Sequence, residues 1–232
     1  MSAPDTDRHT LATRRASLMV LAIFATLGVL MGIVAAGDNV LAVDVRVLET
    51  IQQGDLPGLD LVVRLSNAAF GTAGALVLAV GLITTAAALF KLRVFMVQMA
   101  VVIVLRLAGQ VLKPIFESPR PGIEHQPDPS LVSHTFGYPS GHAYTATIMM
   151  VMFMLFAHAL DAPRWVRGAS IAVAVLGTAI ALFSRVWVGA HWPTDTIGGV
   201  FFGLATVALM QLIVAAIPQV RSSARAQAEP AP

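Results

Sequence analysis

Six long apolar segments constrain the fold of this chain more than any other feature of its sequence. Each is close in length to the roughly 20 apolar residues that a helix needs to cross the hydrocarbon core of a membrane. The segments are residues 16–37, 66–90, 94–112, 143–160, 168–184 and 196–217. Because only helices and closed barrels satisfy every backbone hydrogen bond inside a bilayer, the sequence predicts an all-α integral membrane bundle of six transmembrane helices.

The composition agrees with a membrane protein and excludes several functions. The chain is 56% hydrophobic and only 12% charged, whereas a soluble domain carries about 25% charged residues. The net charge of +2 is too small to indicate nucleic-acid binding. The absence of cysteine excludes disulfides, thiolate metal sites and a cysteine nucleophile.

Polar segments at both ends suggest how the chain is organised. Residues 1–15 and 218–232 are expected to be flexible tails, which leaves 16–217 as one six-helix domain. The first apolar segment exceeds the roughly 7–15 residues of a signal-peptide core, so we expect a retained helix. Residues 43–51 place apolar and charged side chains on opposite faces of a helix, which predicts a short interfacial helix.

The distribution of positive charge predicts the orientation. Six spans place both termini on one side, and nine lysines and arginines fall on that side against five on the other. By the positive-inside rule both termini are cytoplasmic. The loop 113–142 and the hinge 185–195 then both face outward and can form one site. The short chain and minimal loops suggest a bacterial inner membrane, with the site facing the periplasm.

The hinge carries the first group of candidate functional residues. Ionisable side chains near lipid are costly and are functional candidates by default. The spacing of His191 and Asp195 suits a histidine whose second ring nitrogen is held by a carboxylate, which fixes its tautomer. Such a histidine can attack phosphorus, and Arg185 would bind a phosphate oxygen. The alternative for Asp195 is a carboxylate that only stabilises a helix N-terminus.

A second group lies after the third span. Lys113 and Arg120 are separated by a segment that prolines at 114, 119 and 121 stiffen. Such stiffening would hold a lysine, which binds phosphate as a point charge, in a fixed relation to an arginine, which can contact two oxygens at once. The alternative is that both cations only extend to lipid headgroups.

The third group is Ser140, Gly141 and His142, directly before the fourth span. Ser140 suits a helix N-cap, and a helix start presents backbone N–H groups to an anion. His142 would then be a proton donor beside that anion. The alternative is an incidental histidine at a helix end.

Together the three groups supply cations, backbone donors and two histidines, which is what phosphoryl transfer needs. The carboxylates nearby are Glu117, Glu124 and Asp128, and their spacing does not suit a metal site. We therefore expect neither a metal nor another cofactor.

These residues resemble the three signature motifs of the type 2 phosphatidic acid phosphatase superfamily, whose fold is shared with vanadium haloperoxidases and glucose-6-phosphatase. The matching motifs are Lys113-x6-Arg120-Pro121, Pro139-Ser140-Gly141-His142 and Ser184-Arg185-x5-His191-x3-Asp195. The resemblance implies that His191 forms a phosphohistidine while Asp195 holds it, and that His142 is the general acid. It also implies that no metal is required and that the phosphate is bound by Lys113, Arg120, Ser140, Gly141 and Arg185.

The expected substrate is a membrane lipid phosphate: phosphatidate, phosphatidylglycerophosphate or an undecaprenyl-type diphosphate. Arg106 lies about two helical turns before Lys113, on the same face of the third span. It has either a structural partner, such as a carbonyl, or contacts a second phosphate. The alternative functions are a lipid transporter or scramblase, a catalytically silent lipid-phosphate-binding protein, and a haloperoxidase. The last is disfavoured because haloperoxidases of this superfamily are soluble.

Overall fold

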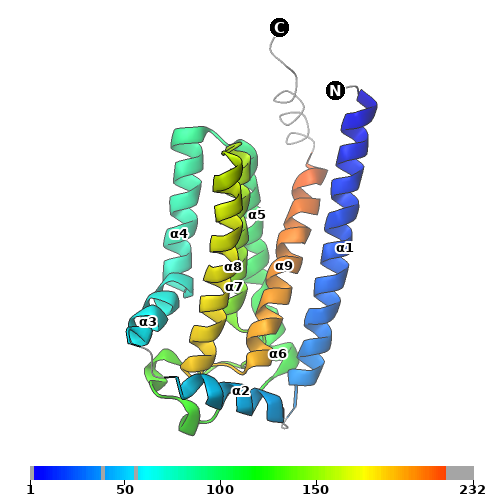
Figure 1. The fold of residues 1–232 in the computed structure, drawn as a ribbon. Helices are drawn as coiled ribbons and strands as arrows, with labels where there is room; N and C mark the ends of the chain where they lie inside the picture. Colours follow the sequence, from blue (N-terminus) through cyan, green and yellow to red (C-terminus); the bar gives the residue numbers. More distant parts are fainter. Residues whose placement is uncertain (1–2, 38–39, 55–56, 218–232) are drawn as a thin grey trace.

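The computed structural model describes residues 3–37, 40–54 and 57–217. In these residues the chain forms a helical bundle without strands (Figure 1). Its helices are α1 (Ala3–Ala35), α2 (Ala42–Gln52), α3 (Leu59–Phe70), α4 (Thr72–Thr85), α5 (Arg93–Ala108), α6 (Leu112–Phe116), α7 (Gly141–Ala159), α8 (Arg164–Trp187) and α9 (Pro193–Ala216). Six helical segments of the described residues are long and apolar enough to cross a membrane. The predicted all-α, six-helix membrane fold is confirmed.

The ends of the predicted spans differ from those observed. Helix α1 begins at Ala3, so residues 3–15 continue the first span as helix where a flexible tail is expected. After Pro4 this stretch contains no glycine or proline to stop the helix. The third span also extends further, because a 3₁₀ turn at Gly109–Val111 joins α5 to α6. The predicted tail 218–232 lies outside the described residues.

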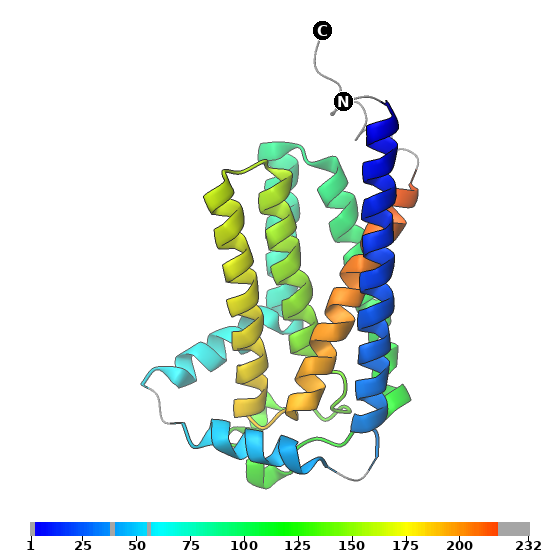
Figure 2. The same ribbon diagram turned by 45° about the vertical axis from the view of Figure 1, so that its right-hand side comes forward.

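The predicted second span, 66–90, is divided at Gly71: its first residues end α3, and the membrane-spanning part is α4 followed by a π-helical turn at Ala86–Phe90. The backbone of Gly71 is extended, which ends α3 and starts α4 in a new direction (Figure 2). A Cβ at Gly71 would come 3.4 Å from Nε2 of His142, and one at Gly74 would lie 1.9 Å from the carbonyl oxygen of Ala68. The two glycines therefore allow α3 to bend sharply and to lie close to α7.

Helices α7 and α9 form the centre of the bundle. In each, 56% of the membrane-spanning window is buried, against 11–17% in the other spans, whose apolar side chains face outward. A Cβ at Gly199 would lie 2.8 Å from the carbonyl oxygen of Ser140, and one at Gly203 would lie 2.7 Å from Thr147. These glycines bring α9 against the N-terminal half of α7.

Different segments of the chain lie at the two ends of the bundle. The start of α1 and the end of α9 lie at one end, whereas α2, α6 and the loop before α7 lie at the other (Figures 1 and 2). The interfacial helix predicted over residues 43–51 is α2, which crosses this second end with Asp44 and Leu48 buried. The loop 113–142 and the hinge between α8 and α9 meet here, as the motif pattern predicts.

Candidate active site

The hinge between α8 and α9 positions the His–Asp pair. Gly189 turns the chain with φ +65°, a conformation that favours glycine, and α9 starts at Pro193. Asp195 then lies in the first turn of α9, where its Oδ2 is 3.3 Å from Nδ1 of His191 and accepts the N–H of Trp192 at 3.1 Å. His191 is 2% exposed and Asp195 is fully buried, so the imidazole is held in one orientation.

The contacts of the imidazole indicate its tautomer. Nη1 of Arg120 lies 3.4 Å from Nε2 of His191. A guanidinium has only donors, so Nε2 must be the acceptor, and Nδ1 carries the proton that it donates to Asp195. The lone pair on Nε2 therefore points toward Arg120 and away from Asp195.

The pKa of His191 is well below its ordinary value. Burial is the largest cause, and the positive charges of Arg120, Arg185 and Lys113, together with His142, lower it further. The imidazole is therefore neutral at physiological pH. It keeps the lone pair that a nucleophile requires.

The three predicted groups surround one cavity of about 300 Å³. The predicted residues that line it are Lys113, Arg120, Gly141, His142, Arg185 and His191. Both histidines thus face the same space, although His142 lies at the start of α7 and His191 lies in the hinge between α8 and α9.

Two predicted residues lie outside that lining. Ser140 accepts the N–H of Ala143 at 3.5 Å, so it caps α7, and its own N–H donates to the backbone oxygen of Asp195 at 3.0 Å. Asp195 is separated from the cavity by His191, the group that it holds. Both residues therefore contribute to the site by holding its walls in place.

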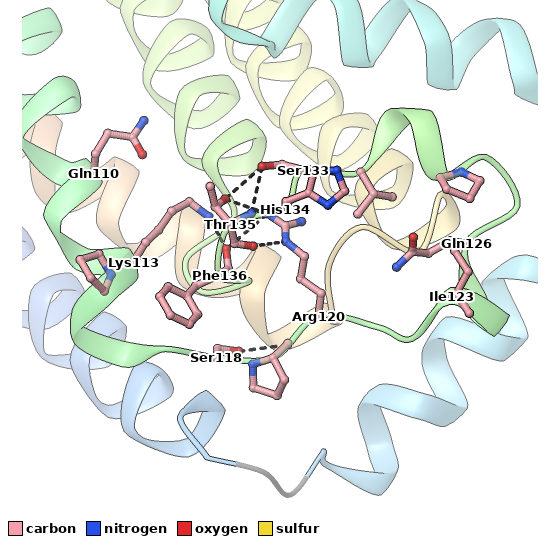
Figure 3. Close-up of a pocket in the computed structure, with 14 residues that line it drawn as sticks. Gln110, Lys113, Ser118, Arg120, Ile123, Gln126, Ser133, His134, Thr135 and Phe136 are labelled. Carbon is pink, nitrogen blue, oxygen red and sulfur yellow. Dashed lines mark hydrogen bonds between the residues drawn. The ribbon is translucent and has the colours of Figure 1, made fainter.

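Loop carbonyls hold the first two cations (Figure 3). Nζ of Lys113 donates to the oxygen of Phe136 at 2.5 Å. Arg120 donates from Nε to the oxygen of Thr135 and from Nη1 to the oxygen of Ala190, both at 2.5 Å. The two side chains approach the Thr135–Phe136 backbone from opposite sides, which places their charges around one space.

The third cation comes from α8. Nη1 of Arg185 donates to Oδ1 of Asn67 on α3, and Nη2 donates to the oxygen of Leu131 at 3.0 Å. Its Nε is buried and has no hydrogen-bond partner among the described residues. Within this part of the chain Lys113, Arg120 and Arg185 form no ion pair. Their charges are therefore available to an anion in the cavity.

Two further cavities adjoin this one. The first, of about 760 Å³, lies among the loop residues and shares Lys113, Arg120 and Thr135 with it (Figure 3). The second, of about 340 Å³, is an apolar groove between α4, α5 and α7. Leu76 and Leu107 in its wall are 60% and 63% exposed, so the groove lies on the lipid-facing surface. The central cavity thus adjoins both a polar vestibule and a lipid-facing groove.

The motif pattern missed three polar residues that support the site. Asp44 of α2 accepts the N–H and the hydroxyl of Thr194 at 3.1 and 2.7 Å, Ser118 donates to Oδ1 of Asp195 at 3.3 Å, and Asn67 holds Arg185. Asp44 and Asn67 were visible as polar residues in largely apolar stretches, but the sequence did not indicate their partners. In the part of the chain that the structure describes, no three His, Asp or Glu side chains are grouped to hold a metal ion.

Fold and site together define a helical integral membrane protein with a cationic cavity of about 300 Å³ beside a His–Asp pair. A family model described as the PAP2 superfamily matches residues 91–218, and the chain belongs to this superfamily. The resemblance of its motifs is thereby confirmed.

Two known proteins are similar to this chain. It is 38% identical over 68 residues to an undecaprenyl-diphosphatase of Sulfolobus acidocaldarius, a match that spans 29% of either chain. Its fold is similar to the crystal structure described as the first transmembrane PAP2 type phosphatidylglycerolphosphate phosphatase from Bacillus subtilis, with a TM-score of 0.67 and 19% identity over 82% of this chain and 94% of that one. The second similarity extends the shared fold to most of the bundle.

Proposed function

We propose that this protein is a metal-independent phosphatase that hydrolyses a lipid phosphate or diphosphate through a phosphohistidine at His191. One observation carries the proposal. The Nε2 lone pair of a neutral, carboxylate-held imidazole lies at a cavity whose cations Lys113, Arg120 and Arg185 have no described carboxylate partner.

In the first half of the reaction the three cations and the N–H of Gly141 would hold the phosphate oxygens. The phosphate would take the place beside Nε2 of His191 that Nη1 of Arg120 now occupies. Nε2 attacks phosphorus, and the bond from phosphorus to the leaving oxygen breaks. His142 donates a proton to that oxygen. Asp195 stabilises the positive charge that develops on His191.

In the second half, water replaces the leaving group. His142, now neutral, accepts a proton from the water as its oxygen attacks phosphorus. The bond between phosphorus and Nε2 breaks, and inorganic phosphate and the free imidazole are regenerated. The three cations stabilise the charge on the equatorial oxygens in both halves.

The apolar groove supports a lipid as the substrate. A chain lying in it would have its phosphate end directed toward the central cavity, and the polar vestibule would supply water and release phosphate. Phosphatidate, phosphatidylglycerophosphate and undecaprenyl-type diphosphate are the candidates. The names of the two relatives, a diphosphatase and a lipid phosphate phosphatase, support this class.

The proposed location is a bacterial inner membrane, with both termini cytoplasmic and the site facing the periplasm. The excess of lysines and arginines that the sequence places on the side of the termini supports this orientation.

Phosphate release from a panel of lipid phosphates in detergent, with EDTA present, tests the proposal. Wild type should turn over at least one lipid, accumulate an acid-labile phosphoprotein and be inhibited by vanadate, a phosphate mimic. His191→Ala should abolish turnover, whereas His158→Ala, which removes an exposed histidine at the far end of α7, should not. Strong inhibition by EDTA would contradict the metal-free mechanism.

The same variants separate the alternatives. A transporter or scramblase would keep its lipid flux in His191→Ala. A catalytically silent binding protein would bind vanadate but release no phosphate from any lipid in the panel.

A further inference from the structure

The cationic cavity and the apolar groove share four residues, which form the rim between them: Thr72, Arg106, Gln110 and Thr145. Arg106 is the only charged one. Any substrate with its phosphate in the cavity and its chain in the groove must pass this rim. The group that follows the attacked phosphate in the substrate therefore lies beside Arg106.

Protein contacts fix the guanidinium of Arg106 but leave part of it free. Nε donates to Oγ1 of Thr145 at 2.9 Å and Nη2 donates to the oxygen of Gly141 at 3.1 Å. The guanidinium also lies 4.7 Å from the centre of the Tyr144 ring. Nη1 donates to no residue of the described chain. Of the two alternatives that the sequence leaves open, the structural partner is thus present as the Gly141 carbonyl, and Nη1 remains as a donor for a second phosphate.

No acidic side chain of the described residues pairs with Arg106. A cation at the edge of an apolar, lipid-facing groove is costly unless an anion or a functional role offsets the cost. The contacts to Thr145 and Gly141 require donors but not a charge, and the face of the Tyr144 ring offsets only part of the cost of the charge. The charge itself therefore indicates an anionic ligand at the rim.

The two candidate lipid classes differ at this point. In a phosphate monoester the attacked phosphate is followed by neutral carbon, whereas in a diphosphate it is followed by a second, negatively charged phosphate. We propose that Arg106 binds the inner phosphate of a lipid diphosphate and makes the site prefer diphosphates to monophosphates, a proposal that rests on the proposed function.

Arg106 would also act on the chemical step with a diphosphate. When Nε2 of His191 bonds to the outer phosphorus, the bridging P–O bond breaks and its electron pair remains on the inner phosphate. The product is the lipid monophosphate, and its leaving oxygen gains negative charge beside Arg106. A donor directed at developing charge stabilises the transition state more than the ground state.

The test compares kcat/KM for the diphosphate and the monophosphate of one prenyl alcohol. Arg106→Gln removes the charge but keeps an amide that can donate to Gly141 or Thr145. We expect it to lower kcat/KM for the diphosphate about 10- to 100-fold, as for a lost charge-assisted hydrogen bond, and to change the monophosphate value less than threefold. Arg106→Lys should restore part of the diphosphate activity.

Thr145→Val is the matched control, because it removes the contact to Nε without removing the charge. It should affect both substrates equally. Unchanged inhibition of Arg106→Gln by vanadate would show that the central cavity is intact. Equal loss on both substrates in Arg106→Gln, or a wild type that prefers the monophosphate, would overturn the inference alone. A wild type that hydrolyses no lipid phosphate would overturn the proposed function and the inference with it.

Discussion

The replacement of Asp195 by asparagine tests the electrostatic role of the His–Asp pair most directly. Asparagine keeps a carbonyl oxygen that can accept from Nδ1 of His191 and from the N–H of Trp192, as Oδ2 does now. Its amide group can donate to the hydroxyl of Ser118, which can turn toward the oxygen of Pro119. The orientation and tautomer of the imidazole are therefore retained, while the negative charge is lost.

The separation of the two groups sets the expected magnitude. At 3.3 Å, and with an effective dielectric constant of about 20, a unit charge stabilises an imidazolium by about 5 kcal/mol. The carbonyl dipole of asparagine recovers part of this energy, so we expect a loss of about 3–4 kcal/mol of transition-state stabilisation. This corresponds to a fall in kcat of about 10²- to 10³-fold.

The assay is steady-state phosphate release, with acid-quenched phosphoprotein and the thermal unfolding midpoint as further readouts. Asp195→Asn should lower kcat and the rate of phosphohistidine formation while the unfolding midpoint stays near that of wild type. Ser118→Ala removes a single hydrogen bond to the same carboxylate and should lower kcat less than tenfold. An Asp195→Asn enzyme that retains more than a tenth of wild-type kcat would refute the reasoning.

The remaining predictions concern the support of the hinge, pH, the groove and the general acid. Asp44→Ala, which removes both contacts of α2 to Thr194 at the start of α9, should lower stability by about 1–2 kcal/mol, as for other lost helix caps; chemical denaturation in detergent measures it, and an unchanged midpoint would count against this role. Because the pKa of His191 is lowered, its imidazole stays neutral and nucleophilic down to low pH, so the acid-side decline of kcat/KM that protonation of His191 causes should lie below pH 6.5. Binding of vanadate should raise this pKa by adding negative charge. A pKa of 6.5 or higher in the free enzyme, measured by histidine NMR, would contradict this prediction. Ala79→Phe fills the apolar groove and should raise KM for long-chain lipids but not for a water-soluble short-chain phosphate, so equal effects on both would argue against a chain in the groove. His142→Ala should slow hydrolysis of monophosphates more than that of diphosphates, because an alkoxide leaving group needs a proton more than a phosphate does; equal slowing of both substrates in stopped assays would show that His142 only binds phosphate.

Much of the site could be predicted because its chemistry is concentrated in short segments. In a chain with 12% charged residues, cations and histidines that occur together at motif spacing stand out from the apolar background. The spacing of four residues also brings the side chains of His191 and Asp195 together locally, because His191 directly precedes the N-cap of α9 and Asp195 lies in the first turn of that helix. The predicted residues that line the cavity could therefore be named from their motifs before any helix was placed.

The supporting residues could not be predicted in the same way. Asp44 lies 150 positions from Thr194 and Asn67 lies 118 positions from Arg185. A hydrogen bond over such a separation depends on how helices pack, and no local pattern encodes it. The division of the second span at Gly71 was missed for a related reason. A single glycine is tolerated within helices, and only the approach of α7 requires the bend at this position.

The linear order of residues therefore determined the membrane environment, the number of spans and the side chains that can handle phosphate, because hydrophobic length and short-range spacing are properties of contiguous segments. Tertiary structure decided which of these residues line the cavity and which hold its walls, as Ser140 and Asp195 do. It also decided that Arg106 lies where polar cavity and apolar groove meet. These outcomes depend on the packing of α4, α5, α7 and α9, which brings distant segments within hydrogen-bonding distance.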